Sequence, residues 1–423
     1  MGNLKLRLQR IRKVGKPHAC EPFSSVAKDP EFFGTEWVSG GFQVLTRSVV
    51  LDPPLILPPS LPSALPILVP DLFHVIADQG TLSPETLVFL DLETTGLSGG
   101  AGTTAFLGAL GRFVPTQHTA KQNPGSGLYQ LQVDQYLLLD YPGEPDFLAA
   151  LLRGWYVSGK PRVLVSYNGK CFDLPLLKTR CLMNQVPLPR YYHADLLHPA
   201  RWLWKGCLPD CSQGSIESRI GLTRIRDLPG ALAPEIWFSF LKSGEPQDLL
   251  RVCEHNQRDI LGLASIFTAL THIAASPLGV VATYRYNLEN AALRWREALK
   301  QGKHPWEAAV QETGSALLKA AATQAYPRAA LVAALDLMEQ GRYEAGRNQL
   351  RELTKGRYPN TFKIAAYRAL ALDAEWRLQD IPGALAYVEA ALSLGELREP
   401  VSQAFQHRRE RLLGKKKDPS CPV

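Results

Sequence analysis

The chain has 423 residues, of which 45% are hydrophobic and 21% are charged, and its formal net charge is +7. This balance is typical of a globular protein and excludes a disordered chain, while the length favours two domains. The most apolar stretch, residues 49–70, contains seven prolines and therefore excludes a continuous membrane-spanning helix. Seven scattered cysteines argue against a disulfide framework, and the Cys207–Cys211 pair lacks a second pair at zinc-ligand spacing. With no secretory signal visible, we expect a cytoplasmic protein that does not bind membranes.

The positive charge is concentrated near both ends of the chain. Residues 1–16 carry six basic side chains and no acid, and residues 407–418 carry six basic and two acidic side chains. Such segments suit a polyanionic partner, because each neutralised phosphate releases counterions. They are equally consistent with two solvated tails.

The predicted elements change in character along the chain. Residues 1–35 are expected to form a basic arm, and residues 36–85 a proline-rich, apolar extended segment with little regular structure that packs on the next domain. From residue 86 onward we predict strands at 87–90, 104–113, 133–139 and 163–167, and helices near 145–153, 172–183 and 246–275. This succession predicts an α/β domain over residues 86–275, with a mixed central sheet and flanking helices.

Beyond residue 280 no strand pattern remains. Residues 285–415 have helical periodicity and are expected to form an all-α domain, followed by a tail at 416–423. The segments Gly341–Ala345 and Asp380–Ala384 are weakly alike, lie 39 residues apart and each separate two apolar helices. This arrangement is similar to tetratricopeptide repeats, although their usual period is about 34 residues. An irregular helical bundle is the alternative.

Two acidic residues stand at the end of a predicted buried strand, in Phe89-Leu-Asp91-Leu-Glu93-Thr-Thr-Gly96. Residues two apart in a strand share a face, so Asp91 and Glu93 project together while Leu90 and Leu92 enter the core. Neighbouring carboxylates repel unless cations neutralise them, and oxygen ligands select hard ions such as Mg²⁺ or Mn²⁺. Taken alone, the pattern also fits a solvated strand edge.

Two further segments supply acids that could join this pair. In Asn168-Gly-Lys-Cys-Phe-Asp173 a turn leads into a helix, and Asp173 falls in its first turn, where the helix dipole favours a carboxylate. His255 and Asp259 are four residues apart on a later helix and therefore share a face. They lie beside a stripe formed by Leu249, Val252, Asn256, Ile260, Leu263 and Phe267. Taken alone, Asp173 is an acid at the start of a helix, and His255 and Asp259 are a hydrogen-bonded pair on a helix surface.

In this order the segments resemble the signature of the DEDD exonucleases of the RNase H-like fold, namely D-x-E, N-x(2–3)-F-D, and an aromatic residue or His before a final Asp. The similarity is closer still to the YprB-type subgroup and extends through Asp195–Arg201 and Asp227–Gly230. It covers about residues 86–272. That subgroup is often joined to tetratricopeptide repeats, in agreement with the helical region.

The resemblance implies a metal-dependent 3′→5′ exonuclease acting on single-stranded DNA or RNA. Asp91, Glu93, Asp173 and Asp259 would hold two Mg²⁺ or Mn²⁺ ions roughly 3.5–4 Å apart. His255 would act as general base or position the attacking water, because imidazole titrates near neutral pH. Its spacing of four residues before Asp259 is that of the family's tyrosine branch, whereas the histidine branch uses five, so its ring could reach differently.

Other candidates adjoin these motifs. We expect Thr94, Asn168 and Lys170 to contact the substrate, in the case of Lys170 because it is a neighbour of the second motif. Asp195 and His193 are two apart on a short predicted strand, and either support the metal ligands from behind or form a local hydrogen bond.

The helix after that strand carries His198, Arg201 and Lys205 on one side, where they would contact a phosphate or form a solvated face. Trp202 could stack on a base or belong to the core.

Two other functions stay open at this point. The protein could be a non-catalytic nucleic-acid-binding adaptor whose C-terminal helices recruit a protein partner, or a structure-selective endonuclease on the same fold. The intact acidic set argues against the adaptor, because clustered carboxylates without metal would destabilise the fold. No residue distinguishes DNA from RNA, or cutting at an end from cutting within a strand.

Overall fold

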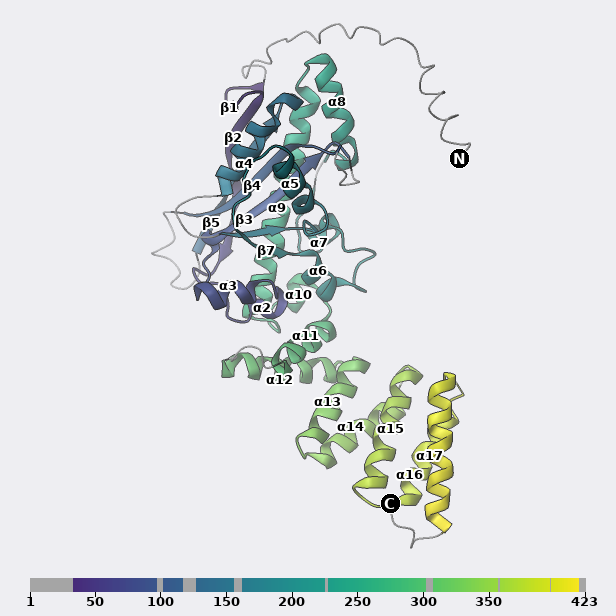
Figure 1. The fold of residues 1–423 in the computed structure, drawn as a ribbon. Coiled ribbons are helices and arrows are strands. Elements are labelled where there is room, and N and C mark those ends of the chain that lie inside the picture. Colours follow the sequence, from purple (N-terminus) through teal and green to yellow (C-terminus); the bar gives the residue numbers. More distant parts are fainter. Residues whose placement is uncertain are drawn as a thin grey trace, which may run out of the picture.

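The computed structural model describes residues 33–96, 102–116, 127–155, 162–224, 227–301, 307–356, 358–395 and 397–417. Most of the predicted basic arm and nearly all of the predicted tail lie outside these ranges. Within them the chain forms one seven-stranded sheet with flanking helices, followed by a region built from helices (Figure 1). This confirms the predicted fold class.

The sheet has the strand order β1-β2-β5-β4-β3-β6-β7. The β1-β2, β2-β5, β5-β4 and β4-β3 pairs are antiparallel, whereas β3, β6 and β7 run parallel. The strands are β1 (Val38–Gly41), β2 (Val44–Leu57), β3 (Leu87–Thr94), β4 (Ala105–Pro115), β5 (Gly127–Leu138), β6 (Val163–Ser166) and β7 (Tyr192–Asp195). The four predicted strands are therefore confirmed as β3, β4, β5 and β6.

Helices and short 3-10 turns surround this sheet. The three predicted helices are confirmed as α4 (Glu144–Trp155), α5 (Asp173–Met183) and α9 (Gln247–Ala275). The others are α2 (Leu65–Leu68), α3 (Leu72–Gln79), α6 (Leu197–Trp204), α7 (Gln213–Arg219), α8 (Ala233–Ser243) and α10 (Val281–Tyr284), with 3-10 turns at Pro84–Thr86, Tyr141–Gly143 and Gly230–Leu232.

The central strand β3 divides its side chains between two hydrophobic cores. Phe89 enters a core that α9 and α2 cover, whereas Leu90 and Leu92 enter a second core that α4, α5 and α8 cover. Because successive side chains of a strand point to opposite faces, Asp91 and Glu93 continue the face of Phe89 toward α9. The strand is thus apolar where it is buried and acidic where it ends.

The expectation of little regular structure at residues 36–85 is wrong. This segment forms β1 and the 14-residue β2, which pairs with β5 over most of its length. Its prolines do not break β2, because Pro53 and Pro54 fall where the β2–β5 register shifts between Leu51 and Leu55. At such a bulge a missing backbone donor costs no ladder hydrogen bond.

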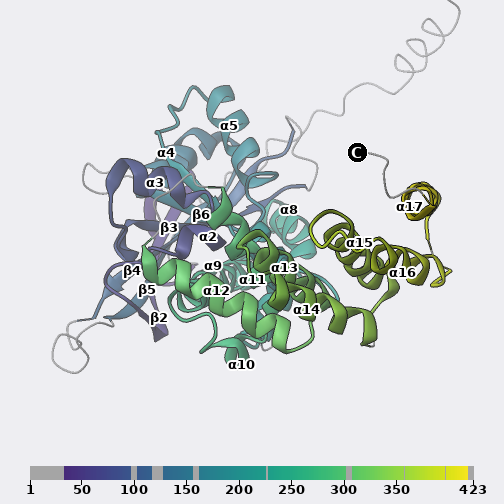
Figure 2. The same ribbon diagram turned by 90° about the horizontal axis from the view of Figure 1, so that it is seen from below.

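The C-terminal helices continue the first core. Buried side chains of α11 (Leu288–Lys300), α12 (Ala308–Thr323) and the start of α13 (Pro327–Glu339) belong to the same apolar cluster as Phe89. The remaining helices have smaller clusters of their own, and are α14 (Tyr343–Lys355), α15 (Asn360–Trp376), α16 (Ile381–Leu392) and α17 (Glu399–Lys417). Figure 2 shows α15, α16 and α17 extending away from the sheet. No helix among the described residues is long and apolar enough to span a membrane.

Candidate metal centre

The carboxyl end of β3 presents two acids toward α9. Asp91 accepts a hydrogen bond from the Nδ2 of Asn256, at 2.7 Å from its Oδ2. Glu93 lies two residues further along the strand, on the same face, and its Oε1 is 4.0 Å from the Nε2 of His255. The strand therefore brings both carboxylates to one surface of the long helix.

Helix α9 contributes the predicted His-Asp pair. The Nε2 of His255 lies 3.2 Å from the Oδ2 of Asp259, as their four-residue spacing requires. One donor atom each from Glu93, His255 and Asp259 all lie within 4.8 Å of one another, so a single cation could contact all three. The spacing of four thus places the imidazole within the donor group itself.

Asp173 begins α5 at the end of a tight loop that Asp195 holds. The carboxylate of Asp195 accepts hydrogen bonds from the backbone N–H groups of Asn168 and Lys170, at 2.8 and 3.0 Å. Asn168 has a positive φ of 65°, which asparagine tolerates well, and a Cβ at Gly169 would lie 3.1 Å from an Asp173 oxygen and 2.3 Å from the Ser166 hydroxyl. This loop therefore needs its Asn-Gly pair in order to bring Asp173 to the site.

The four predicted acids form one electrostatic unit. Burial, and then the charges of Asp259, Glu93 and Asp173, raise the pKa of Asp91 well above its usual value. Burial followed by the charges of Asp259 and Asp173 raises the pKa of Glu93 to about 8, and burial raises that of Asp173 to about 7. Burial also raises the pKa of Asp259, although His255 and Arg224 oppose the rise. The four carboxylates therefore interact through their charges, while the group of donor atoms within 4.8 Å of one another contains Glu93 and Asp259 and not Asp91 or Asp173.

A charge network behind α9 holds Asp259 and His255. The guanidinium of Arg224 lies 2.5 Å from Asp259, 2.6 Å from the fully buried Glu217 and 2.8 Å from Asp227. Asp227 also accepts from the Nδ1 of His255 at 2.9 Å. Burial alone would raise the pKa of Asp227, but hydrogen bonds from Arg224, His255 and Arg258 lower it to about 2. An ionised Asp227 fixes the Nδ1–H tautomer of His255 and leaves Nε2 facing the acids.

A second relay of polar side chains crosses the core to Asp91. The Nε of Arg47 on β2 donates to Gln135 on β5 at 2.8 Å, and Gln135 donates to Asn256 at 2.8 Å. Asn256 then donates to Asp91. Gln135 and Asn256 are fully buried, so these hydrogen bonds are needed to satisfy them and they orient the Asp91 carboxylate.

The remaining predicted residues lie around this centre with other partners. The hydroxyl of Thr94 donates to the carbonyl of Gly96, and the Nζ of Lys170 forms an ion pair with Asp71 at 2.6 Å. His193 lies on β7 with Asp195, and its Nε2 is 2.7 Å from the Ser166 hydroxyl. Burial lowers the pKa of His193 to about 4, so it is neutral at pH 7. Of this pair, Asp195 is the residue that contacts the Asp173 loop.

The sequence reasoning missed four side chains that the structure adds to the centre: Gln135, Glu217, Arg224 and Asp227. Asp227 belongs to a motif that carried the resemblance but had no role. Asn256 appeared only as a member of an otherwise apolar helix stripe. A polar residue at a core position is itself a signal, because a buried amide requires a partner.

The donor set fits a divalent cation. Carboxylates that burial and mutual repulsion hold at raised pKa values bind a hard cation in place of protons. Arg224 is the cation in direct contact with the cluster among the described residues, and it is shared with Glu217 and Asp227. Asp91, Glu93, Asp173 and Asp259 are the residues that would hold such ions, and the Nε2 of His255 lies within reach of the Glu93 and Asp259 carboxylates.

Comparison with known proteins agrees with this fold. Residues 88–271 match the family model described as the RNase_H superfamily. This match is to the RNase H-like region of the chain, and all four acids and His255 lie within it. A Bacillus subtilis (strain 168) protein with the name "Uncharacterized protein YprB" is 38% identical over 200 residues. This match confirms the family resemblance of the motifs, and it spans 46% of this chain and 44% of that relative.

Proposed function

We propose that this protein is a metal-dependent exonuclease that shortens single-stranded nucleic acid from its 3′ end. The observation that carries the proposal is that donor atoms of Glu93, His255 and Asp259 lie within 4.8 Å of one another, and that the charges of Asp91 and Asp173 act on this group and raise its pKa values. The buried Glu375 of the helical region contacts several cations, whereas among these four acids and within the described residues only Asp259 contacts an arginine, Arg224. The direction and the preference for ends rest on the family resemblance.

The four carboxylates would hold two Mg²⁺ or Mn²⁺ ions. When bound, such ions activate a water for attack on phosphorus and stabilise the departing 3′ oxygen. Ions would replace the protons that these carboxylates hold at their raised pKa values, and Asn256 holds the Asp91 carboxylate in a fixed orientation. Arg224 holds Asp259 from the side opposite His255.

His255 is proposed to accept the proton of the attacking water. Asp227 binds its Nδ1–H and favours the imidazolium that forms, so Nε2 is the atom that takes up the proton. The Nε2 lies 4.0 Å from Glu93 and 3.2 Å from Asp259, so it would accept the proton directly beside these two carboxylates.

The first experiment measures hydrolysis of a 5′-labelled single strand in the presence of Mn²⁺. Wild-type protein should produce a ladder of progressively shorter labelled products, and Asp173→Ala should produce none while unfolding at an unchanged temperature. Asp248→Ala is the matched control, because Asp248 lies on α9 with its side chain 70% exposed. Full activity of Asp173→Ala, or of the wild type in excess chelator, would refute this site.

Two added substrates separate the proposal from its alternatives. A circular single strand has no end, so its cleavage would indicate the endonuclease. Binding of a linear strand without any hydrolysis in Mn²⁺ or Mg²⁺ would indicate the non-catalytic adaptor. DNA and RNA strands of the same sequence, run side by side, determine which sugar the site accepts.

A further inference from the structure

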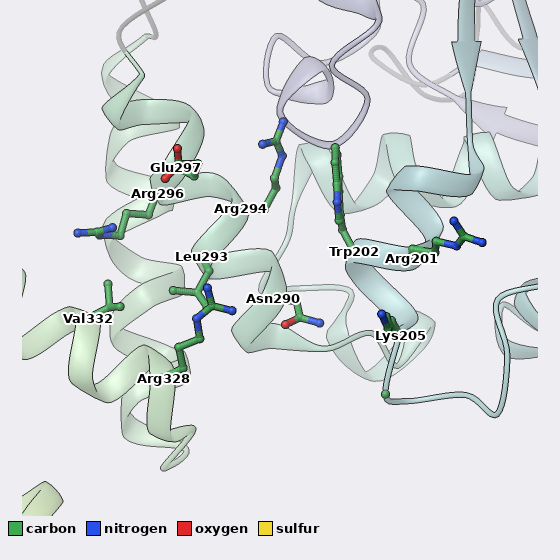
Figure 3. Close-up of a pocket in the computed structure, with 11 residues that line it drawn as sticks. Arg201, Trp202, Lys205, Asn290, Leu293, Arg294, Arg296, Glu297, Arg328 and Val332 are labelled. Carbon is green, nitrogen blue, oxygen red and sulfur yellow. The ribbon is translucent and has the colours of Figure 1, made fainter. Parts of the chain in front are cut away.

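A basic pocket of about 620 Å³ lies where the RNase H-like domain meets the C-terminal helices (Figure 3). One wall comes from α6 and the residues just after it, and the other from α11 and α13. Its charged and aromatic lining includes Arg201, Trp202, Lys205, Arg294, Arg296 and Arg328. Glu297 is the one acid among the lining residues.

Most of these cations form no ion pair in the part of the chain that the structure describes. Among the residues that the structure describes, Arg201, Lys205, Arg294 and Arg328 belong to no ion pair. Arg296 differs, because its Nη2 lies 2.5 Å from Asp336. Four unpaired cations around one pocket repel each other, and an anionic ligand relieves that repulsion.

Arg294 is held in place rather than free in solvent. Its Nε donates to the carbonyl of Ile67 at 2.9 Å, and its guanidinium lies 4.3 Å from the centre of the Trp202 ring. Figure 3 shows the two side chains alongside each other, one from each wall. Burial lowers the pKa of Arg294, the mark of a guanidinium that has lost water contacts. A partly desolvated, fixed guanidinium is suited to a phosphate.

Arg201 relates the pocket to the loop before Asp173. It lines the pocket from α6. Burial raises the pKa of the Tyr167 hydroxyl, and the charge of Arg201 opposes that rise. Tyr167 donates to the carbonyl of Cys211 at 2.5 Å, and it immediately precedes the loop that contains Asn168. Arg201 is therefore within electrostatic range of the residue before that loop.

We propose that this pocket binds phosphates of the single-stranded nucleic acid whose 3′ end lies at the acid cluster. The proposal rests on the proposed function, which it extends by giving the strand a second contact point upstream of the cut. We favour a strand with several phosphates over a single small anion, because the cations that line the pocket come from α6, α11 and α13 and not from one element. The C-terminal helices would then act in substrate binding through Arg294 and Arg328.

The test measures binding without chemistry. A 5′-fluorescent 20-nucleotide strand is titrated with protein in excess chelator, and anisotropy is read at several salt concentrations. In the triple variant Arg201→Gln, Lys205→Gln, Arg328→Gln we expect affinity at 0.1 M salt to fall at least about tenfold, and the salt slope to fall by about 2. The variant Arg201→Lys, Arg328→Lys keeps the charge and should keep the slope.

The matched control removes the same charge elsewhere. Lys363→Gln, Arg368→Gln, Arg398→Gln changes three basic side chains of the outer helical region that likewise belong to no ion pair among the described residues. Affinity should change less than twofold. Thermal unfolding of both triple variants should match the wild type.

Several outcomes would overturn the pocket assignment. These are equal loss in both triple variants, no loss in the pocket variant, or equally tight binding of a free mononucleotide. Displacement of the strand by poly-glutamate at equal charge concentration would indicate an acidic protein partner instead and would also overturn it.

Measuring KM and kcat for hydrolysis distinguishes this proposal from the nuclease proposal. In Mn²⁺ the pocket variant should raise KM for the strand at least about tenfold with kcat within twofold, because the acid cluster is intact. A wild type that binds the strand through the pocket but hydrolyses nothing would leave the strand contact standing and remove the nuclease.

Discussion

Buried acids in the two regions of this molecule have opposite surroundings. Glu375 in the C-terminal helices is 4% exposed, and it contacts Arg408 at 2.8 Å and Lys415 at 3.3 Å as well as Arg411. Burial would raise its pKa, but these cations lower it. The side chain of Glu93 in the RNase H-like domain is 12% exposed, yet its neighbours are acids, and its pKa rises to about 8.

The difference separates a structural charge from a functional one. Three cations satisfy Glu375 within the chain, so it needs nothing from outside. The carboxylates around Glu93 are left in excess, which costs folding free energy that bound protons or cations offset. Perturbed pKa values of this kind gather at functional sites.

The largest expected effect is the loss of activity when the charge of Glu93 is removed. Glu93→Gln removes a charge that would bind metal, so we expect hydrolysis to fall by about 10³-fold, or roughly 4 kcal/mol of transition-state stabilisation. Stability should hold or rise, because a repelling charge is gone. Strand shortening and thermal unfolding in chelator measure the two quantities. Loss of activity together with loss of folding would show that Glu93 is structural like Glu375.

The next effect tests the role of the imidazole. His255→Ala should lower hydrolysis by about 10²-fold or more, the usual contribution of a general base. Because His255 is proposed to move a proton, Mn²⁺ affinity measured by calorimetry should change little. Asp227→Asn should lower activity by about 10- to 100-fold through the tautomer of His255. A collapse of Mn²⁺ affinity in His255→Ala would instead make the imidazole a ligand.

The third effect is a pH dependence of stability in the metal-free protein. Glu93 and Asp173 have folded pKa values of about 8 and about 7, well above those of the unfolded chain. At pH values between the unfolded and the folded pKa of each group, the folded state holds a proton that the unfolded state releases. The free energy of unfolding therefore falls as pH rises from about 4 to 8. From pH 6.5 to 8 we expect these two groups to lower it by roughly 2 kcal/mol.

The control for this pH effect is the double variant Glu93→Gln, Asp173→Asn, in which the fall should be smaller than in the wild type. Added Mn²⁺ should stabilise the wild type more at pH 8 than at pH 6, because protons no longer compete for the carboxylates. An identical pH profile in wild type and double variant would contradict the raised pKa values.

The smallest expected effect is in the helical region. Glu375→Gln leaves its basic partners without a counter-charge, and since they are partly exposed we expect a loss of about 1–2 kcal/mol in unfolding free energy. Hydrolysis per folded molecule should not change. Lower activity at full folding would mean that the outer helices also act at the site.

Much of the centre was predictable because its ligands obey local periodicities. The two-residue spacing places Asp91 and Glu93 on one strand face, and the four-residue spacing places His255 over Asp259. The turn residues Asn168 and Gly169 indicate where α5 begins. These relations depend on backbone geometry within a few residues, so the sequence alone determined them, together with the mixed sheet and the helical region that follows.

Long-range contacts decided the rest. Arg224 and Asp227 reach His255 and Asp259 from a loop about 30 residues earlier in the chain. Gln135 reaches Asn256 across 121 residues, and no local pattern links them. The basic pocket needs α6 beside α11, which comes from a core that both regions share. Side-chain partners at such separations depend on how the elements pack, and only the tertiary structure decides that.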